Sequence, residues 1–411
     1  MTAGVDAAFG FDPWSPGFVE HPYGVYAALR AHAPVVWYEP TRQWLVSRHA
    51  DVNALLRDRR LGRTYLHVAT HEEMGHAPDP PHLAPFWRVV RNGMLDREPP
   101  DHTRLRRLVS QAFTPRMVDR LRPRILVICD RLVDDLLDAT ADGGTADLMP
   151  LVAEPLPVTV IAEMLGVPEA DRALLRPWSA DICGMYELSP GPDVAQAASA
   201  ASAEFSEYVR GLARMRRESP GEDLISDLAH VVDGGDRLTE DELIGTVVLL
   251  LNAGHEASVH VTGNGWAALF RNPGELERLR ADPSLLETGL DELLRYDTPL
   301  QMFERWVLED LEVAGQRVRR GEEVALLFGS ANRDPARFAD PERLDLGRRE
   351  NPHLSFGAGT HYCLGAPLAK VELAALFATL LRRAPGLAPA GEPVGNSGYI
   401  IRGLATLPVT R

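Results

Sequence analysis

Apolar side chains recur at helical spacing over several long stretches of the chain. The stretch LIGTVVLLLNAGHEASVHVTGNGWAALF follows Thr239 and Glu242, a pair three residues apart that is typical of a helix N-terminus. Helical spacing also runs through LGAPLAKVELAALFATLLRRA, where Gly and Pro fall only in the first turn. Two β-rich runs flank the turn-like EPTR within residues 33–52, and two more flank Gly321. The pattern therefore predicts long helices together with short strands.

Composition and charge narrow the class of protein. Of the 411 residues, 45% are hydrophobic and 25% are charged, which is typical of a globular protein. The net charge of −15, from 58 acidic and 43 basic side chains, disfavours nucleic acid or an anionic membrane as a partner. The longest apolar stretch is too short to span a membrane, and the N-terminal residues lack the pattern of a secretory signal. We therefore expect a cytoplasmic protein.

The three cysteines differ in their surroundings. Cys129, Cys183 and Cys363 lie far apart and are odd in number, so reduced thiols are expected rather than a disulfide framework. Cys129 and Cys183 are expected to be inert buried thiols. Cys363 instead follows the glycines of FGAGTHYCLG and directly precedes a predicted helix. A helix N-terminus favours a thiolate, and glycines let the backbone wrap closely around it.

Several kinds of site use such a thiolate. A zinc site needs four ligands, and only His361 accompanies Cys363. The glycine pattern departs from the dinucleotide-binding fingerprint because Tyr362 occupies the third glycine position. A Cys–His hydrolase stays open as an alternative. A heme iron needs a single thiolate, which favours cleavage of the O–O bond.

FGAGTHYCLG resembles the heme-binding loop of the cytochrome P-450 family, F-G-x-G-x-H-x-C-x-G. The matched positions are Phe356, Gly357, Gly359, His361, Cys363 and Gly365. This resemblance implies heme b with Cys363 as the axial ligand of the iron. It also implies a mainly α fold with a smaller β-rich lobe, of triangular-prism shape, with the heme between a distal helix and the cysteine loop. A single domain over residues 1–411 is expected.

ELLR, with Glu292 and Arg295, is a second similarity to the family. A Glu and an Arg three residues apart can form an ion pair on a helix. The same spacing recurs at residues 207/210 and 275/278, where a solvated helix face is the expected setting. Because of its position upstream of the cysteine loop, the resemblance implies that Glu292 and Arg295 form a buried structural pair that holds this loop.

PPDHTRLRRLVSQAFTP is similar to the family's helix at the heme edge. His102 and Arg106 are four residues apart and share one helix face, whereas Arg104 and Arg107 point elsewhere. The contacts to the heme propionates that the resemblance implies are His102, Arg106, Arg305 and His361. Arg104 and Arg107 are expected to form a local basic surface for an acidic electron donor.

AGHEAS resembles the family's distal-helix motif, A-G-x-[DE]-T-[ST]. The matching positions are Ala253, Gly254, Glu256 and Ser258. Ala257 departs from the motif because it stands where the family usually has a threonine that helps to guide protons. An acid inside an apolar helix is costly unless it is paired, protonated or hydrated, so Glu256 is a candidate for proton delivery. The expected catalytic residues are Gly254, Glu256, Ala257 and Ser258, and His255 is expected to be a packing or surface residue.

The substrate-facing parts are expected in a long loop at 61–95, in 178–203 and in 396–401. The expected substrate pocket comprises Ala253, Leu300, Met302, Phe303 and Ile400. These are largely apolar, which suits a hydrophobic substrate, although a plain core role is an open alternative. Four histidines in the 61–95 segment fit no compact set of metal ligands, so solvated histidines are expected there.

By its resemblance, the chain is identified as a bacterial-type heme-thiolate monooxygenase that inserts one oxygen atom of O2 into a C–H bond or an alkene. Electrons from NAD(P)H are expected to arrive through a separate ferredoxin and ferredoxin reductase, and a monomer is expected. The alanine at 257 suggests a substrate that supplies its own hydroxyl, such as a polyketide or macrolide of specialised (secondary) metabolism and antibiotic biosynthesis. Oxidative coupling or rearrangement, and a non-catalytic heme-thiolate sensor, are the alternatives.

Overall fold

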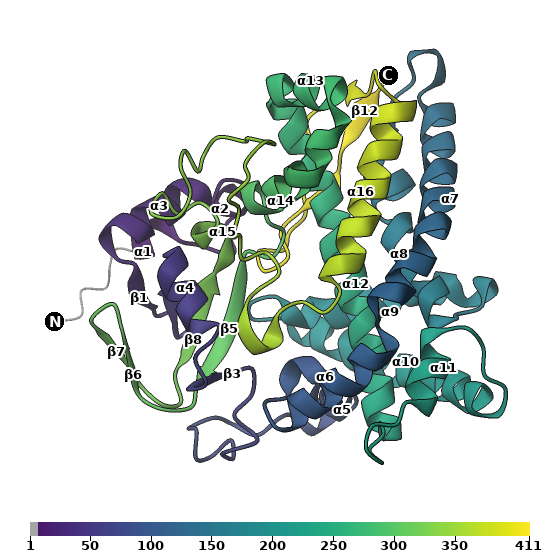
Figure 1. The fold of residues 1–411 in the computed structure, drawn as a ribbon. Coiled ribbons are helices and arrows are strands. Elements are labelled where there is room, and N and C mark those ends of the chain that lie inside the picture. The colour runs from purple at the N-terminus through teal and green to yellow at the C-terminus, as the bar shows by residue number, and fades with distance from the viewer. Residues whose placement is uncertain (1–6) are drawn as a thin grey trace. The chain divides into compact units, whose positions relative to one another are not determined.

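The computed structural model describes residues 7–411 and divides into two compact units. Unit 1 contains the described residues up to Gly62, Ile125–Leu156 and Ala257–Arg411. Unit 2 contains Arg63–Arg124 and Pro157–Glu256. Three helices run from one unit into the other: α7 (Pro115–Ala139), α8 (Pro155–Leu165) and α12 (Glu240–Arg271). Helices dominate both units (Figure 1), so the prediction of a mainly helical fold with a smaller β-rich part is confirmed.

All of the named strands lie in unit 1. Its largest sheet has the order β1-β2-β8-β5-β3, with β2 and β8 parallel and the other pairs antiparallel. The strands of this sheet are β1 (Val35–Tyr38), β2 (Gln43–Val46), β3 (Leu61–Gly62), β5 (Met302–Val307) and β8 (Glu323–Leu327). The smaller sheets are formed by β4 (Ala146–Asp147), β12 (Pro408–Thr410) and β9 (Ala388–Pro389), by β6 (Leu311–Val313) and β7 (Gln316–Val318), and by β10 (Val394–Gly395) and β11 (Leu404–Thr406).

The helices of unit 1 come from the two ends of the chain. They are α1 (Ala7–Gly10), α2 (Pro16–Glu20), α3 (Tyr23–His32), α4 (His49–Leu55), α13 (Pro273–Ala281), α14 (Leu286–Tyr296), α15 (Phe328–Ala331) and α16 (Ala366–Arg383). Its short helical turns are η3 (Ala141–Gly143), η4 (Met149–Ala153), η7 (Pro283–Leu285) and η8 (Gly359–His361). Apolar side chains from β1, β2, β5 and β8 join those of α4 and α15 in one buried cluster, which also includes Leu354 and Ala358. The chain just before the cysteine loop is thereby anchored in the core of this unit.

Unit 2 consists of helices. They are α5 (Ala84–Asn92), α6 (Asp101–Ala112), α9 (Arg172–Cys183), α10 (Pro192–Glu218) and α11 (Leu224–His230), with the short turns η1 (Pro81–Leu83), η2 (Met94–Asp96), η5 (Glu169–Asp171) and η6 (Gly184–Tyr186). The long helix α10 packs against α5, α9 and α11. Helix α12 approaches the end of α5 at Gly245, where an added Cβ would lie 2.7 Å from the backbone nitrogen of Gly93. Only glycine permits so close a contact between the two segments.

Several local predictions can be compared with these elements. The capping box is confirmed, because the Thr239 backbone N–H donates to the Glu242 carboxylate and the Glu242 N–H donates to Thr239 Oγ1. The Ala/Ser-rich run at 195–205 is helical, within α10. Two strands were predicted around Gly321, but the segment forms three, β6, β7 and β8. The first predicted strand is divided into β6 and β7 by a turn with positive φ at Ala314 and Gly315. The segment 61–95 was predicted to be one long loop. This prediction was wrong for Ala84–Asn92, which form helix α5.

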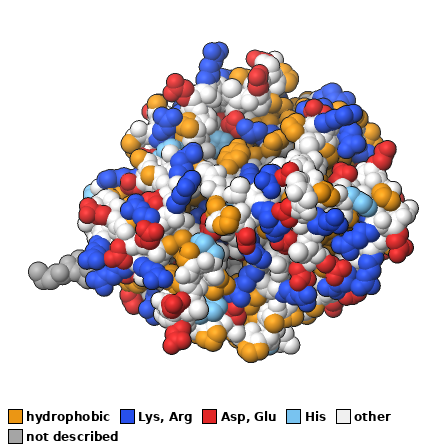
Figure 2. Space-filling model, turned by 60° about the horizontal axis from the view of Figure 1, so that its bottom comes forward, with side chains coloured by type: hydrophobic (Ala, Val, Ile, Leu, Met, Phe, Trp, Pro, Cys, Tyr) orange, Lys and Arg blue, Asp and Glu red, His pale blue; other side chains and the backbone are white. Residues whose placement is uncertain are grey.

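The surface carries both signs of charge. Figure 2 shows a face on which basic and acidic side chains are interspersed. Within residues 7–411, no helix combines the length and the apolar character needed to cross a membrane. Over the same residues, no group of three or more His, Cys, Asp or Glu side chains is arranged to hold a metal ion, so the histidines at 67–82 form no such set.

Candidate functional site

The cysteine loop of unit 1 is a tightly hydrogen-bonded turn between α15 and α16. The Cys363 N–H donates to the Phe356 carbonyl at 3.0 Å, and the Gly357 N–H donates to the Leu354 carbonyl at 2.8 Å. Gly357 and Gly359 both have a φ of +68°, a conformation that favours glycine. An added Cβ at Gly359 would also lie 2.5 Å from the Leu56 carbonyl oxygen. Both glycines are therefore required for the loop to curl around the cysteine.

Cys363 itself lies close to the start of α16. Gly365 is the N-cap of this helix, and a Pro stands in its first turn, where no backbone donor is needed. An added Cβ at Gly365 would lie 3.9 Å from Cys363 Sγ, an ordinary contact, so this glycine lies next to the sulfur. Cys363 is partly exposed, whereas Cys129 and Cys183 are buried, as predicted. Burial raises the pKa of the Cys129 thiol to about 12, and the Glu372 and Asp130 carboxylates act in the same direction, so this thiol stays protonated.

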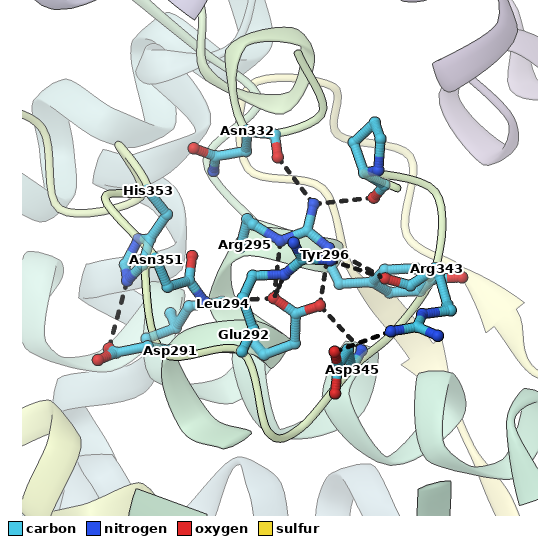
Figure 3. Close-up of polar contacts among 12 residues, drawn as sticks. Asp291, Glu292, Leu294, Arg295, Tyr296, Asn332, Arg343, Asp345, Asn351 and His353 are labelled. Atoms are coloured by element: carbon cyan, nitrogen blue, oxygen red, sulfur yellow. Dashed lines mark hydrogen bonds and ion pairs between the residues drawn. The ribbon is translucent and has the colours of Figure 1, made fainter. Parts of the chain in front are cut away.

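Glu292 and Arg295 form a completely buried ion pair on α14 (Figure 3). Arg295 donates from Nε and Nη2 to the two carboxylate oxygens of Glu292, at 2.7 and 2.8 Å. Its Nη1 also donates to the carbonyls of Asn332 and Pro341, both at 2.9 Å. Glu292 in turn accepts from the Asp345 backbone N–H, from Arg348 and from Asn351. The carboxylate and the guanidinium are thus both extensively hydrogen-bonded, which a buried charged pair requires.

This buried pair is connected to the cysteine loop through Asn332. The Asn332 carbonyl accepts from Arg295, and its side chain accepts from the Leu354 N–H at 2.7 Å and donates to Ser355 Oγ at 2.9 Å. Ser355 Oγ donates back to the Leu294 carbonyl of α14 at 2.8 Å. The residues directly before Phe356 are therefore held by side chains and backbone of one buried network.

The other side of the loop is also tied to α14. Asp291 forms an ion pair with Lys370 of α16 at 2.7 Å and accepts from His353 at 3.3 Å. Burial raises the pKa of Asp291, but the hydrogen bonds from His353 and Lys370 outweigh it and leave that pKa below its usual value. Lys370 is the only lysine in the chain. Helix α14 thus contacts the segments on both sides of Cys363.

The four residues expected at the propionates occupy different elements. In unit 1, Arg305 lies in β5 and is 3% exposed, with its guanidinium 4.8 Å from the centre of the Phe303 ring, and His361 is partly exposed at the end of η8. In unit 2, His102 and Arg106 lie on α6. His102 is 2% exposed and Arg106 is partly exposed. All four side chains are thus basic groups that are either buried or only partly exposed.

Arg104 and Arg107, on the other faces of α6, both have acidic partners in unit 2. Arg104 contacts Glu242 at the start of α12 and Asp236, the latter at 3.3 Å, and its side chain is 28% exposed. Arg107 contacts Asp233 and is 56% exposed. The Glu242 carboxylate therefore accepts a hydrogen bond in the capping box and also pairs with Arg104. The acids of the 233–242 segment were not foreseen as partners because nothing local in the sequence links them to α6.

The small residues of α12 occupy its most accessible part. Ala253 is exposed and Gly254 and Ala257 are partly exposed, although most of the surrounding helix is buried. An added Cβ at Gly254 would lie 3.5 Å from Ile161 Cδ1, an ordinary contact. The face that carries these three residues therefore has little side-chain cover. Ser258 is buried, and its carbonyl accepts from Thr262 Oγ1 at 3.1 Å.

Glu256 lies beside a buried histidine. His255 is 3% exposed, and its Nδ1 is 3.4 Å from the Glu256 carboxylate, whose side chain is 21% exposed. His255, interpreted from sequence as a packing or surface residue, is thus buried and paired. Burial, and secondarily the charge of Glu256, raises the pKa of the Cys183 thiol. Glu256 is therefore partly exposed, which lowers the cost of an acid in an apolar helix.

The residues expected around the substrate are brought together in part by backbone pairing in unit 1. Leu300 forms an isolated bridge with Ile401, and the Gln301 N–H donates to the Ile400 carbonyl at 3.0 Å. Met302 is fully buried at the start of β5. Phe303, the next residue, packs against the buried cluster of the large sheet. Met302 and Phe303 thus contact the core, whereas Leu300 and Ile400 lie on two segments that pair with each other.

Comparisons with known proteins support the family. The cytochrome P450 family model matches residues 191–384. Cytochrome P450 monooxygenase PikC of Streptomyces venezuelae is 40% identical over 400 residues, which cover 95% of this chain and 91% of that protein. This chain is a cytochrome P450. The P450 is also 38% identical over 397 residues to the 6-deoxyerythronolide B hydroxylase of Saccharopolyspora erythraea, covering 94% of the P450 and 95% of the relative.

The fold of this P450 is that of its solved relatives. The structure of the Bacillus subtilis bacillaene polyketide synthase cytochrome P450 PksS has a TM-score of 0.88 and 35% identity, covering 97% of this chain and 99% of that one. The chain is therefore a P450 monooxygenase with the P450 fold. Membership of the family implies a heme bound through a cysteine thiolate.

Proposed function

We propose that this P450 inserts one oxygen atom of O2 into a hydrophobic specialised metabolite such as a polyketide or a macrolide. The observation that carries the proposal is the cysteine loop, which glycines curl around Cys363 and which a buried network anchors on α14. The substrate class is supported by the relatives, since PksS belongs by name to a polyketide synthase and another relative is named a hydroxylase of 6-deoxyerythronolide B. We propose hydroxylation or epoxidation in antibiotic biosynthesis, of which hydroxylation matches the name of the second relative.

The residues present suit heme b. Cys363 precedes a helix N-terminus, which favours a thiolate, and would ligate the iron. His102, Arg106, Arg305 and His361 would bind the propionates, whose negative charges match guanidinium and imidazole donors. When bound, a thiolate-ligated heme supplies the chemistry that activates O2. The small, little-covered face of α12 at Ala253, Gly254 and Ala257 suits a helix that passes close to such a group.

Proton delivery is the step for which the chain's own residues matter most. Ala257 cannot donate or accept a proton, and Ser258 lies about 100° further around the helix and is buried. Glu256, partly exposed and beside His255, can hold a proton and pass it on through water. We propose that a hydroxyl of the substrate orders the water that the missing threonine would otherwise order. Acid–base groups contribute about 10² to 10⁴ in rate, so some group must fill this role.

Electrons are proposed to come from NAD(P)H through a ferredoxin reductase and a ferredoxin that docks on a local basic surface. Arg107 supports this part of the proposal because it is 56% exposed, whereas Arg104 is largely engaged by Glu242 and Asp236. The ion pair between Arg107 and Asp233 would have to break before Arg107 could bind the partner. The enzyme is proposed to act as a monomer in the cytoplasm, and its three free cysteines are consistent with that compartment.

The heme-thiolate proposal is tested by reducing the protein under carbon monoxide. We expect the far-red Soret band characteristic of thiolate ligation, and its loss in Cys363→Ala. Cys129→Ala and Cys183→Ala are the matched controls and should retain the band, because both thiols are buried and neither lies in the cysteine loop. An unchanged band in Cys363→Ala would contradict the proposal. Substrate-induced spectral shifts across a panel of macrolides and polyketides then test the substrate class, and binding without turnover would favour a sensor.

Substrate-assisted proton delivery is tested with a true substrate and an analogue that lacks its pocket hydroxyl. In the wild type, we expect the analogue to consume NAD(P)H and to release mainly peroxide. Ala257→Thr should recover part of the productive coupling with the analogue, because the threonine hydroxyl replaces the missing one. Equal coupling of both compounds in the wild type would show that the protein carries its own proton relay.

A further inference from the structure

His260, on the part of α12 that belongs to unit 1, is packed directly against the C-terminal hairpin of β10 and β11. The histidine is 8% exposed. A Cβ added at Gly403 would lie 2.0 Å from His260 Nδ1 and 2.2 Å from Cγ, which is inside the ring's van der Waals surface. The imidazole thus fills the space that the absent side chain of residue 403 leaves. With His260 in place, only glycine fits at position 403.

Hydrogen bonds of Asn396 define how the ring meets the hairpin. Asn396 Oδ1 accepts from the Gly403 N–H at 3.0 Å, which leaves the amide NH2 group facing the other way. This NH2 donates to the Ile401 carbonyl at 2.9 Å and lies 3.4 Å from His260 Nε2. Because an amide NH2 can only donate, this contact requires Nε2 as the acceptor, which a neutral ring can supply. Burial lowers the pKa of His260 to about 4, which agrees with a neutral ring.

One turn further along α12, Asn264 binds the same segment. Its Nδ2 donates to the Arg402 carbonyl at 3.2 Å and to the Asp297 carbonyl at 3.3 Å. Residues 396–403, which we call the hairpin loop, are therefore tied to α12 by two side chains on adjacent turns. The loop is also paired with the start of β5, since Gln301 N–H donates to Ile400 and Arg402 N–H donates to Pro299.

These contacts connect the distal helix to two residues of the expected pocket. Ile400 lies in the hairpin loop, and Leu300 pairs with its neighbour Ile401. Ala257 precedes His260 by three residues and so lies about one turn away on the same helix. Any change in the spacing between His260 and Gly403 would therefore move Ile400 and Leu300 relative to Ala257.

We propose that His260 is a positioning residue for substrate selection, because its ring, seated against Gly403, sets the separation between α12 and the hairpin loop. This separation determines how much room a substrate has beside Leu300 and Ile400. The inference rests on the proposed function, which assigns these two residues to the substrate pocket. His260 acts through the loop and does not itself contact the reacting atoms.

The test measures the binding of imidazoles graded in bulk, through the shift that their ligation to heme causes in the Soret band. The probes are imidazole, 1-benzylimidazole and 1-(diphenylmethyl)imidazole. Gly403→Ala adds a methyl group against the ring and should push the loop away from α12, so that the bulkiest probe gains affinity relative to imidazole by about fivefold or more. His260→Ala lets the loop settle toward the helix and should change this ratio in the opposite direction.

The double variant His260→Ala/Gly403→Ala gives the added methyl group the space of the ring, and its ratio should return to within about twofold of the wild type. Gly395→Ala, in the same hairpin, is the matched control, because its Cβ would meet only the Gly403 carbonyl at 3.8 Å. Unchanged ratios in both single variants would overturn the inference even though imidazole itself still binds. If the wild type shows neither the thiolate band with carbon monoxide nor an imidazole shift, the proposed function fails instead. If Gly403→Ala does not fold, Asn264→Ala provides a further variant, which removes the donor to the Arg402 and Asp297 carbonyls and leaves His260 and Gly403 in place.

Discussion

Two neighbouring helices of unit 1 carry the same Glu-x-x-Arg spacing in very different surroundings. On α14, Arg295 lies 2.7 Å from Glu292, and both side chains are 0% exposed. On α13, Arg278 lies 2.6 Å from Glu275, and their side chains are 49% and 17% exposed. Helix geometry brings each pair together, so the distances are nearly equal. The comparison teaches that spacing determines whether a pair forms, whereas burial determines what the pair does for the fold.

The partners of the two arginines explain the difference. Arg295 donates to three backbone carbonyls besides Glu292, those of Asn332, Pro341 and Arg343, so it joins segments that are far apart in sequence. Arg278 contacts Glu275 and Asp345 but is itself half-exposed, so water competes for its charge. Exposed pairs contribute little to stability, whereas removal of one partner of a buried pair leaves the other charge poorly compensated.

The largest effect is expected from Arg295→Met. The substitution leaves Glu292 buried with fewer donors and three carbonyls without theirs, so the free energy of unfolding should fall by about 3–5 kcal/mol. Urea unfolding followed by circular dichroism measures this change, and heme content after purification should fall with it. Arg278→Met is the matched control and should cost less than about 1 kcal/mol. Equal losses in the two variants would contradict the assigned role of burial.

A smaller and more local effect is expected from Asn332→Ala. This side chain accepts from the Leu354 N–H and donates to Ser355 Oγ, and so connects the buried network to the residues directly before the cysteine loop. Its removal leaves the Leu354 N–H without that acceptor, at a cost of about 1–3 kcal/mol. We expect the far-red Soret band of the carbon monoxide complex to be lost at a lower urea concentration than the helical signal. If band and helical signal are lost together, as in the wild type, the network does not support the loop specifically.

The sequence predicted best the features that are local or that carry a family motif. The capping box of Thr239 and Glu242, the strands around EPTR and the helix after Cys363 follow from spacing within about 20 residues. Helix α5 was missed because it has only nine residues and follows a segment rich in Pro, Gly and His, which reads as a loop.

Contacts between distant segments were not predictable from one sequence. Asn332 and Lys370 contact groups on other elements, and nothing near either residue indicates those partners. The same holds for His260 and Gly403, which lie near opposite ends of the segment Ala257–Arg411 and yet are in contact. The residue types at 260 and 403 are visible in the sequence, but neither type indicates a role by itself. Only the contact between His260 and Gly403 gives either residue one.

The smallest effect on stability, and the one that extends the comparison to unit 2, is expected from Arg107→Glu. Arg107 is the most exposed of the paired arginines of α6, so its loss should change the free energy of unfolding by less than about 1 kcal/mol. If α6 docks an acidic ferredoxin, the charge reversal should slow reduction at low salt and flatten its dependence on ionic strength, because exposed charges act mainly on encounter. Stopped-flow reduction measures both quantities. Arg278→Glu makes the same change in net charge on α13 and should leave the rate unchanged, so equal rates for Arg107→Glu and this control at every ionic strength would remove Arg107 from the docking surface.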